Sequence, residues 1–127
     1  MPKFPVLLAV AALFAACEHG AESEPPLTPA AGLSPETQAA VDRIAVARCD
    51  REQRCNAVGP HAEYETRDKC VSVMSSDALE ELFGCRKGIK SDELEKCVGL
   101  IAHEDCGGPI DRLERWVQCR AAALCAD

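Results

Sequence analysis

The sequence predicts a small all-α domain, a bundle of about four or five short helices stapled by four disulfides. Apolar residues recur at helical spacing over residues 36–127, and no run of alternating apolar and polar residues is long enough for a strand. Eight of the nine cysteines lie between Cys49 and Cys125. Such an even number behind an export signal predicts paired cystines.

The composition explains why the domain needs disulfides for its stability. Once a leader and a tail are set aside, about 90 residues remain, which is room for one domain. Aromatic residues make up only 4% of the chain, so the core must come mainly from Leu, Val, Ile and Ala. The formal net charge is −7, which argues against nucleic acid as a partner because backbone binding needs clustered Lys and Arg.

Residues 1–16 are predicted to be a signal peptide. Lys3 supplies the positive start, and Phe4 to Ala16 carry no charge. This run of about 13 residues is too short for a membrane-spanning helix, which needs about 20. Its end resembles the lipobox of bacterial lipoproteins, in which a lipidated Cys follows small residues, although Phe14 stands where an aliphatic residue is usual: Leu13-Phe14-Ala15-Ala16-Cys17.

Cys17 is therefore predicted to carry the lipid anchor. Ordinary cleavage after Ala16 would leave Cys17 as an unpaired ninth thiol, whereas lipidation leaves eight cysteines to pair. Glu18 follows the anchor instead of the Asp associated with inner-membrane retention in the lipoproteins this resembles, which favours the outer membrane. Residues 17–35, including the anchor, are rich in Pro, Ala and Glu and predict a disordered tether.

The first helix is predicted to begin at Ser34-Pro35-Glu36, which provide a cap, a proline at the first helical position and an early acid. A buried stripe extends it to about Arg54. Cys49 and Cys55 lie six residues apart, a rise of about 9 Å in a helix, so each must bond elsewhere. The stripe consists of Val41, Ile44, Ala45 and Cys49.

Further helices follow the same kinds of signal. Thr66 is predicted to cap one and Ser75-Ser76 another, and Ser91 begins a helix that ends near His103. Pro109 opens the last. Its apolar residues form two faces, so we expect it to pack on both sides, with the first and last helices side by side. The faces are Ile110, Leu113, Val117, Ala121 and Leu124, and Trp116, Cys119 and Ala123.

Eight cysteines can pair in roughly a hundred ways, and the sequence does not choose among them. The eight are Cys49, Cys55, Cys70, Cys85, Cys97, Cys106, Cys119 and Cys125. Short loops favour Cys97 with Cys106, which closes a turn, and Cys55 with Cys70, which closes the loop containing Gly59 and Pro60.

The sequence contains no motif for metal or redox chemistry. No Cys-x-x-Cys occurs, and an exported protein oxidises its thiols, so the cysteines and His19, His61 and His103 do not predict a zinc site or a redox pair. We expect no metal and no cofactor.

Catalytic motifs are missing as well. There is no Gly-x-Ser-x-Gly, and His103 at a helix end suits the helix dipole better than general-base catalysis. Paired acids are expected at helix starts or in solvated turns: Glu80-Glu81, Asp92-Glu93 and Glu104-Asp105. We therefore expect no enzymatic activity.

The most distinctive segment is residues 49–55. Its alternating charges are typical of an exposed helix face, with Arg48 and Glu52 paired at i, i+4. With this segment the chain resembles a family of small cysteine-rich myxobacterial lipoproteins of unknown function, whose label is associated with natural product biosynthesis. The resemblance implies a compartment but no reaction, ligand or site. It is carried by Cys49-Asp50-Arg51-Glu52, Arg54-Cys55-Asn56, Val58-Gly59, Tyr64, Arg67, Cys70, Cys85, Gly88-Ile89, Leu94, Cys97, Glu104-Asp105-Cys106, Pro109, Asp111, Leu113, Cys119-Arg120 and Leu124-Cys125.

Two hypotheses of function follow. The first is a non-enzymatic binding or structural domain presented on the outer membrane, with a protein or small-molecule partner. The second is an accessory protein for the biosynthesis, export or binding of an exported natural product, which only the resemblance implies. A concave pocket with convergent polar groups favours the second hypothesis, and a convex polar surface favours the first.

Overall fold

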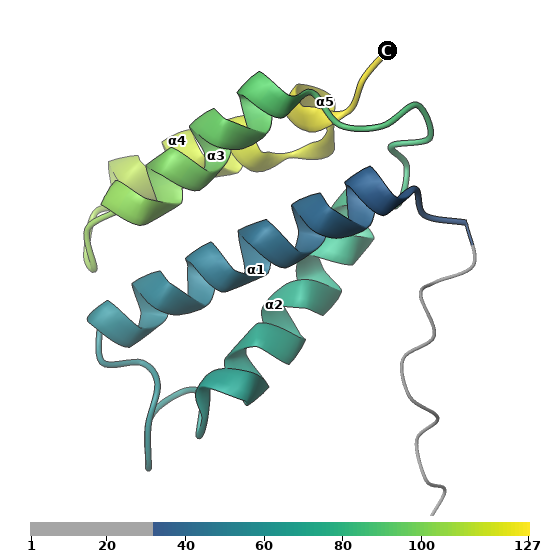
Figure 1. Cartoon of the computed structure of the whole chain (residues 1–127). Helices are drawn as coiled ribbons and strands as arrows, with labels where there is room; N and C mark the ends of the chain where they lie inside the picture. Colours follow the sequence, from purple (N-terminus) through teal and green to yellow (C-terminus); the bar gives the residue numbers. More distant parts are fainter. Residues whose placement is uncertain (1–31) are drawn as a thin grey trace, which may run out of the picture.

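The computed structural model describes residues 32–127, which form the all-α domain that the sequence predicts (Figure 1). Within this range there are two isolated β-bridges and no strand. The predicted signal peptide, Cys17 and the tether up to residue 31 lie outside the described residues. The helices are α1 (Pro35–Arg54), α2 (Arg67–Leu82), α3 (Ser91–His103), α4 (Pro109–Cys119) and α5 (Ala121–Leu124).

Side-chain caps begin the first two helices, as predicted. The Ser34 hydroxyl accepts a hydrogen bond of 3.1 Å from the Thr37 backbone N–H, and Thr66 accepts one of 3.1 Å from Lys69. Each cap satisfies a backbone donor that has no partner inside the helix. The predicted cap at Ser75-Ser76 is wrong, because α2 continues through these residues and the Ser76 hydroxyl donates back to the Ser72 carbonyl instead.

The helices form two hairpins packed against each other, α1 with α2 and α3 with α4 (Figure 1). The backbone of α1 contacts α2 and α3, whereas α4 contacts only α3 and α5. The expectation that the first and last helices lie side by side is therefore wrong. The disulfide between Cys97 and Cys119 ties α4 to α3, and α3 covers α1.

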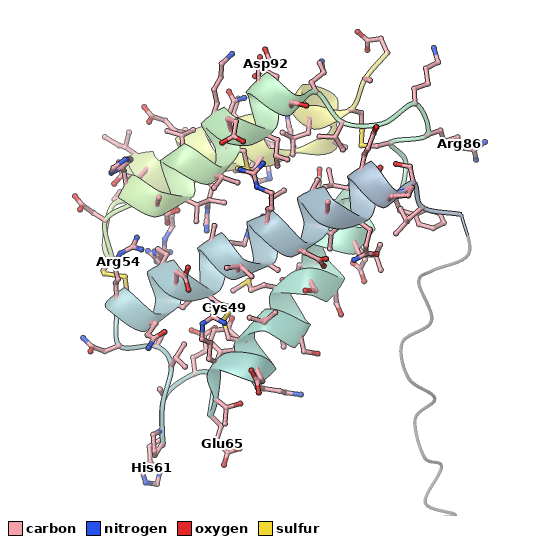
Figure 2. The ribbon with its side chains drawn as sticks, viewed as in Figure 1. Cys49, Arg54, His61, Glu65, Arg86 and Asp92 are labelled. Carbon is pink, nitrogen blue, oxygen red and sulfur yellow. A yellow bond between two sulfur atoms is a disulfide. The ribbon has the colours of Figure 1, made fainter. Side chains whose placement is uncertain are left out.

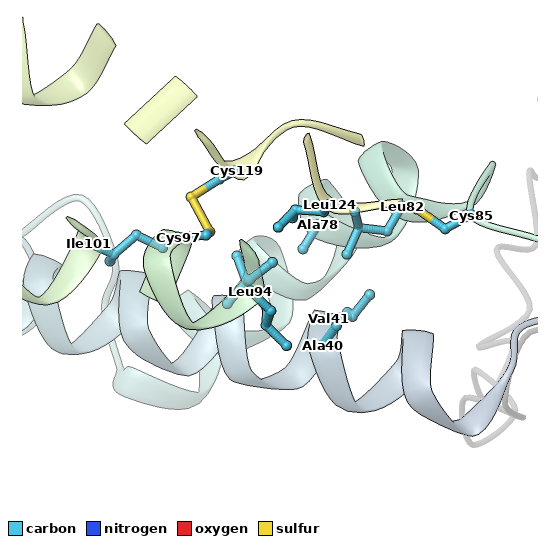
Figure 3. Close-up of a cluster of buried hydrophobic side chains, with 11 residues drawn as sticks. Ala40, Val41, Ala78, Leu82, Cys85, Leu94, Cys97, Ile101, Cys119 and Leu124 are labelled. Carbon is cyan, nitrogen blue, oxygen red and sulfur yellow. A yellow bond between two sulfur atoms is a disulfide. The ribbon is translucent and has the colours of Figure 1, made fainter. Parts of the chain in front are cut away.

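The core lies between α1, α2, α3 and α5. Its largest fully buried side chains are Ile44, Leu82, Ile101 and Leu124. Leu124 of the short last helix lies beside Ala78 and Leu82 of α2 (Figure 3). From α4 only Cys119 is buried, so α4 holds its place by other means than an apolar face.

The last helix is shorter than predicted. Helix α4 ends at Cys119, and Arg120 has the extended dihedrals φ −80° and ψ 158° before α5 begins. This break turns Leu124 into the core and lets Cys125 reach Cys85. The expectation that the last helix packs on both sides is wrong, because its apolar residues from Ile110 to Val117 are exposed.

The four predicted disulfides form, but neither of the expected short-loop pairs does. The bonds span sequence separations of 21 to 51 residues, and two of them join helices while the other two join segments next to helix ends. Cys55 at the end of α1 meets the turn before α4, and Cys97 faces α4 across the second hairpin. Helix packing, and not loop length, decides the pairing. The bonds are Cys49–Cys70, Cys55–Cys106, Cys85–Cys125 and Cys97–Cys119.

These pairs are open to direct measurement. Mass spectrometry of the unreduced, protease-digested protein is expected to give these four linked peptide pairs and no stoichiometric metal. A peptide that links Cys55 to Cys70 would contradict the structure, and so would free thiols that titrate with zinc. Digestion after reduction, which must release every peptide singly, is the control.

Candidate functional site

A cavity of about 350 Å³ lies between the first hairpin and α4. It exists because the backbones of α2 and α4 do not contact each other, which leaves one side of the four-helix arrangement open. Charged and aromatic side chains from three helices converge on it. They are Arg48 and Glu52 of α1, Met74, Asp77 and Glu81 of α2, and Arg115, Trp116 and Cys119 of α4, with Arg120 after it.

Arg48 is the unusual member of this wall. Its guanidinium forms no hydrogen bond or ion pair with any described residue, and its Nε is buried. Burial lowers the pKa of Arg48 and the nearby charge of Arg115 lowers it further, while the more weakly acting charges of Asp77, Glu81 and Glu104 raise it. Arginine nonetheless remains protonated in proteins. The cavity therefore holds an unpaired, partly desolvated cation.

The expected pair between Arg48 and Glu52 does not form. Glu52 instead accepts a hydrogen bond of 2.7 Å from Arg51, its neighbour in the chain. Arg51 is itself only 5% exposed, so residues 49–55 are not simply an exposed charged face. Because Arg51 occupies Glu52, the guanidinium of Arg48 is left facing the cavity without a partner.

Two further guanidinium groups complete the basic side of the cavity. Arg115 directs its Nε to Glu104 at 3.0 Å, and Arg120 lies over the ring of Trp116, 5.4 Å from its centroid. The second arrangement is a cation–π contact, which holds Arg120 and Trp116 together at the rim. Three arginines and one indole thus share a single hollow.

The acidic side of the cavity is largely occupied. Besides Glu52, Glu81 accepts a hydrogen bond of 2.8 Å from the backbone N–H of Ala121. Asp77 is exposed and has no hydrogen bond or ion pair among the described residues. Asp77 is consequently the lining acid without a protein partner, and among the acids near Arg48 it acts most strongly on that arginine.

Helix α4 packs its polar face against the domain and exposes its apolar face, the opposite of an ordinary surface helix. Its inward residues make polar or covalent contacts, Arg115 with Glu104, Gln118 with Glu93, and Cys119 with Cys97. Its outward residues are apolar, although a helix normally buries that face. The outward residues are Ile110, Leu113, Trp116 and Val117, which are 70, 60, 62 and 44% exposed.

A buried ion cluster supports the inner wall. Glu104 is 5% exposed and lies 3.2 Å from Arg51 of α1 and 3.0 Å from Arg115 of α4, and neither carboxylate oxygen accepts an aligned hydrogen bond. Arg51 also donates to the carbonyl of Asp105 at 3.0 Å. The expectation of a solvated turn at Glu104-Asp105 is wrong for Glu104, because α1 and α4 cover it.

A second hollow, of about 460 Å³, lies between α1 and α3, but its charged groups already have partners. Arg43 pairs with Glu95 at 2.8 Å, and Arg54 donates to a backbone carbonyl of α3. Asp50 pairs with Arg67. The cavity that contains Arg48 is therefore the better candidate for a binding site.

The two histidines among the described residues lie away from this cavity, and His19 lies outside the described residues. His61 lies at the tip of the loop between α1 and α2 (Figure 2), and His103 is the last residue of α3, and both are exposed. The described residues contain no cluster of three potential metal ligands. None of the helices in residues 32–127 is long and apolar enough to cross a membrane.

The fold and the site together define a class of protein: a small helical domain cross-linked by disulfides, with a charged cavity beside a helix whose apolar face is exposed. The chain belongs to a family of unknown function (DUF6184), whose model matches residues 49–127. The match includes all eight paired cysteines and every cavity residue except Arg48, which directly precedes it. The comparison with curated proteins found no match, and neither did the comparison with solved structures.

Proposed function

We propose that the protein is an outer-membrane lipoprotein, anchored through Cys17, whose domain binds a small molecule without transforming it. The observation that supports binding is the cavity, which is concave and gathers three guanidinium groups and an indole. A hollow of a few hundred Å³ with convergent polar groups is typical of small-molecule sites. The same feature favours the second hypothesis, in which the ligand is an exported natural product.

The chemistry of the wall supports binding over catalysis. Arginine stays protonated and so is a poor proton donor or acceptor, and Cys119 is consumed by its disulfide. Glu52 and Glu81 already accept hydrogen bonds from protein donors. These groups can orient and neutralise a ligand, which is what a carrier or receptor requires.

The test of binding works for a ligand of any identity. The mature protein is extracted from its own membranes under native conditions, and its mass is compared before and after unfolding. We expect one small molecule to accompany the folded domain and to be released unchanged on unfolding. A folded domain that carries no molecule, or that converts the released molecule when the two are mixed again, would contradict the proposal.

The anchor has a separate test. Replacement of Cys17 with alanine is expected to abolish membrane association and to leave the domain folded, because the predicted tether separates the two. Cell fractionation measures the first effect, and far-ultraviolet circular dichroism of the released protein measures the second. If the variant stays in the membrane fraction, the lipoprotein assignment is wrong.

A further inference from the structure

We infer that the ligand of this cavity is an anionic amphiphile, a single molecule with a carboxylate or phosphate head and an apolar tail. The head lies against Arg48 inside the cavity, and the tail lies on the outward face of α4. This inference rests on the proposed binding function and adds the chemical class of the ligand.

The head group follows from the state of Arg48. The buried Nε of Arg48 has no hydrogen-bond partner, which is costly for a charged group, and an anion that enters the cavity can accept hydrogen bonds from this guanidinium. Carboxylate and phosphate suit the planar fork of arginine, which can donate two parallel hydrogen bonds to either. Arg115 and Arg120 line the same cavity, and with Arg48 they match the charges of its three acids, Glu52, Asp77 and Glu81.

The acids that line the cavity determine how strongly it prefers an anionic head group. Glu52 and Glu81 face arginine or backbone donors, so Asp77 is the acid whose charge opposes a bound anion most directly. Asp77 lies at the exposed rim, where water screens its charge. Because screening weakens this repulsion without removing it, the neutral Asp77→Asn variant is expected to bind anions more tightly than the native protein.

The apolar tail of the ligand is inferred from the exposed apolar face of α4. Ile110, Leu113 and Val117 recur at i, i+3 and i+7 and expose one continuous apolar strip. Trp116 lines the cavity and is also exposed beside this strip, so it connects the two surfaces. Exposed apolar patches of this kind on a monomer mark interaction sites. Because the strip begins at the rim of the hollow that holds the unpaired Arg48, an amphiphile with an acidic head complements both surfaces.

The geometry favours one free molecule over the surface of a bilayer. Arg48 lines the cavity together with residues of α2 and α4, so an anion must enter the hollow to reach it, whereas the head groups of a flat membrane stay outside. The cavity volume of about 350 Å³ is at the lower end of the range for small-molecule sites. A head group with the first part of a chain fills such a space, and the rest of the chain extends along α4.

The experiment uses the single tryptophan of the chain as its reporter. Trp116 fluorescence is titrated with dodecanoate and dodecyl phosphate below micelle formation, with dodecyltrimethylammonium as the cationic comparison. We expect a saturable spectral shift with both anions and none with the cation. Equal binding of the cation would overturn the inference.

Three variants locate the head group. Arg48→Gln is expected to weaken anion binding by about tenfold or more, the usual cost of a lost charge-assisted hydrogen bond. Arg86→Gln is the matched control, because Arg86 is exposed in the loop between α2 and α3 (Figure 2), and it is expected to bind as the native protein does. Asp77→Asn is expected to tighten binding. Native affinity in Arg48→Gln would overturn the assignment of the head.

Thermal melting separates a binding role of Arg48 from a structural one. Without ligand, Arg48→Met is expected to melt a few degrees higher than the native domain, because an unpaired charge leaves a half-buried site. It should also lose the stabilisation that dodecanoate gives the native protein. A lower melting temperature together with retained stabilisation by dodecanoate would contradict the inference.

Failure of this inference is distinct from failure of the binding function. A co-purifying ligand that is neutral or cationic and binds Arg48→Gln normally would overturn the amphiphile and leave the binding function in place. Vesicles of anionic phospholipid test whether the anionic head group comes from a membrane surface and not from a single free molecule. If they compete with dodecanoate as well as free dodecyl phosphate does, and depend equally on Arg48, the single-molecule assignment is wrong.

Discussion

Reduction of the four disulfides is expected to unfold the domain at room temperature. The bonds close separations of 21 to 51 residues, for which the chain-entropy model gives about 3 to 4 kcal/mol each. A whole domain has about 5 to 15 kcal/mol of stability. The four bonds together therefore account for most of the stability that a domain of this size can have.

The make-up of the core explains why it cannot replace the staples. Of the fourteen apolar residues that are buried within residues 32–127, five are half-cystines and three are alanines, which leaves six larger aliphatic side chains. Large aliphatic side chains contribute most of the burial energy of a core. A core this small does not offset the conformational entropy of the chain once the cross-links are gone.

Circular dichroism in the far ultraviolet measures the effect. The helical signal is expected to collapse when reductant is added at room temperature, while the oxidised protein keeps its signal under modest heating. The oxidised protein in the same buffer is the control. If the reduced protein kept a cooperative thermal transition within a few degrees of the oxidised one, the aliphatic side chains would suffice alone.

Most of the helix starts could be predicted from the sequence because their signals are local. A cap at Ser34, a proline at Pro35 and a cap at Thr66 act on neighbouring backbone groups, and the structure has helices beginning at Pro35 and Arg67. The disulfide partners could not be predicted in this way. Each doubling of loop length costs only about 0.6 kcal/mol, so helix packing easily outweighs the preference for a short loop.

The orientation of α4 could not be predicted either. Helical spacing shows that Ile110, Leu113 and Val117 share a face, but it does not show which face is packed. Contacts that are distant in sequence decide it, the disulfide from Cys119 to Cys97 and the ion pair from Arg115 to Glu104. The unpaired state of Arg48 has the same kind of origin, because it depends on what surrounds the cavity.

Replacement of Glu104 with alanine is expected to cost about 3 to 5 kcal/mol of unfolding free energy, the usual effect of removing one member of a buried ion cluster. Glu104 is the acid between Arg51 of α1 and Arg115 of α4. Without it, two guanidinium groups face each other across a site from which water is largely excluded, since Arg51 is 5% exposed. Arg51 would keep Glu52, whereas Arg115 has no other ion pair among the described residues.

Urea unfolding of the oxidised variant measures the loss, with the shift of the midpoint at constant slope as the readout. Glu114→Ala is the matched control, because Glu114 is exposed on the same helix as Arg115 and its replacement is expected to change stability by less than about 0.5 kcal/mol. In the double variant Glu104→Leu with Arg115→Leu, much of the lost stability should return, because the stranded charge of Arg115 is gone, Arg51 keeps Glu52, and leucine fills the space. If Glu104→Ala unfolded at the same urea concentration as the control, the cluster would not hold α4 to α1, and the wall of the cavity would depend on the contacts of α4 with α3, chiefly the disulfide at Cys119.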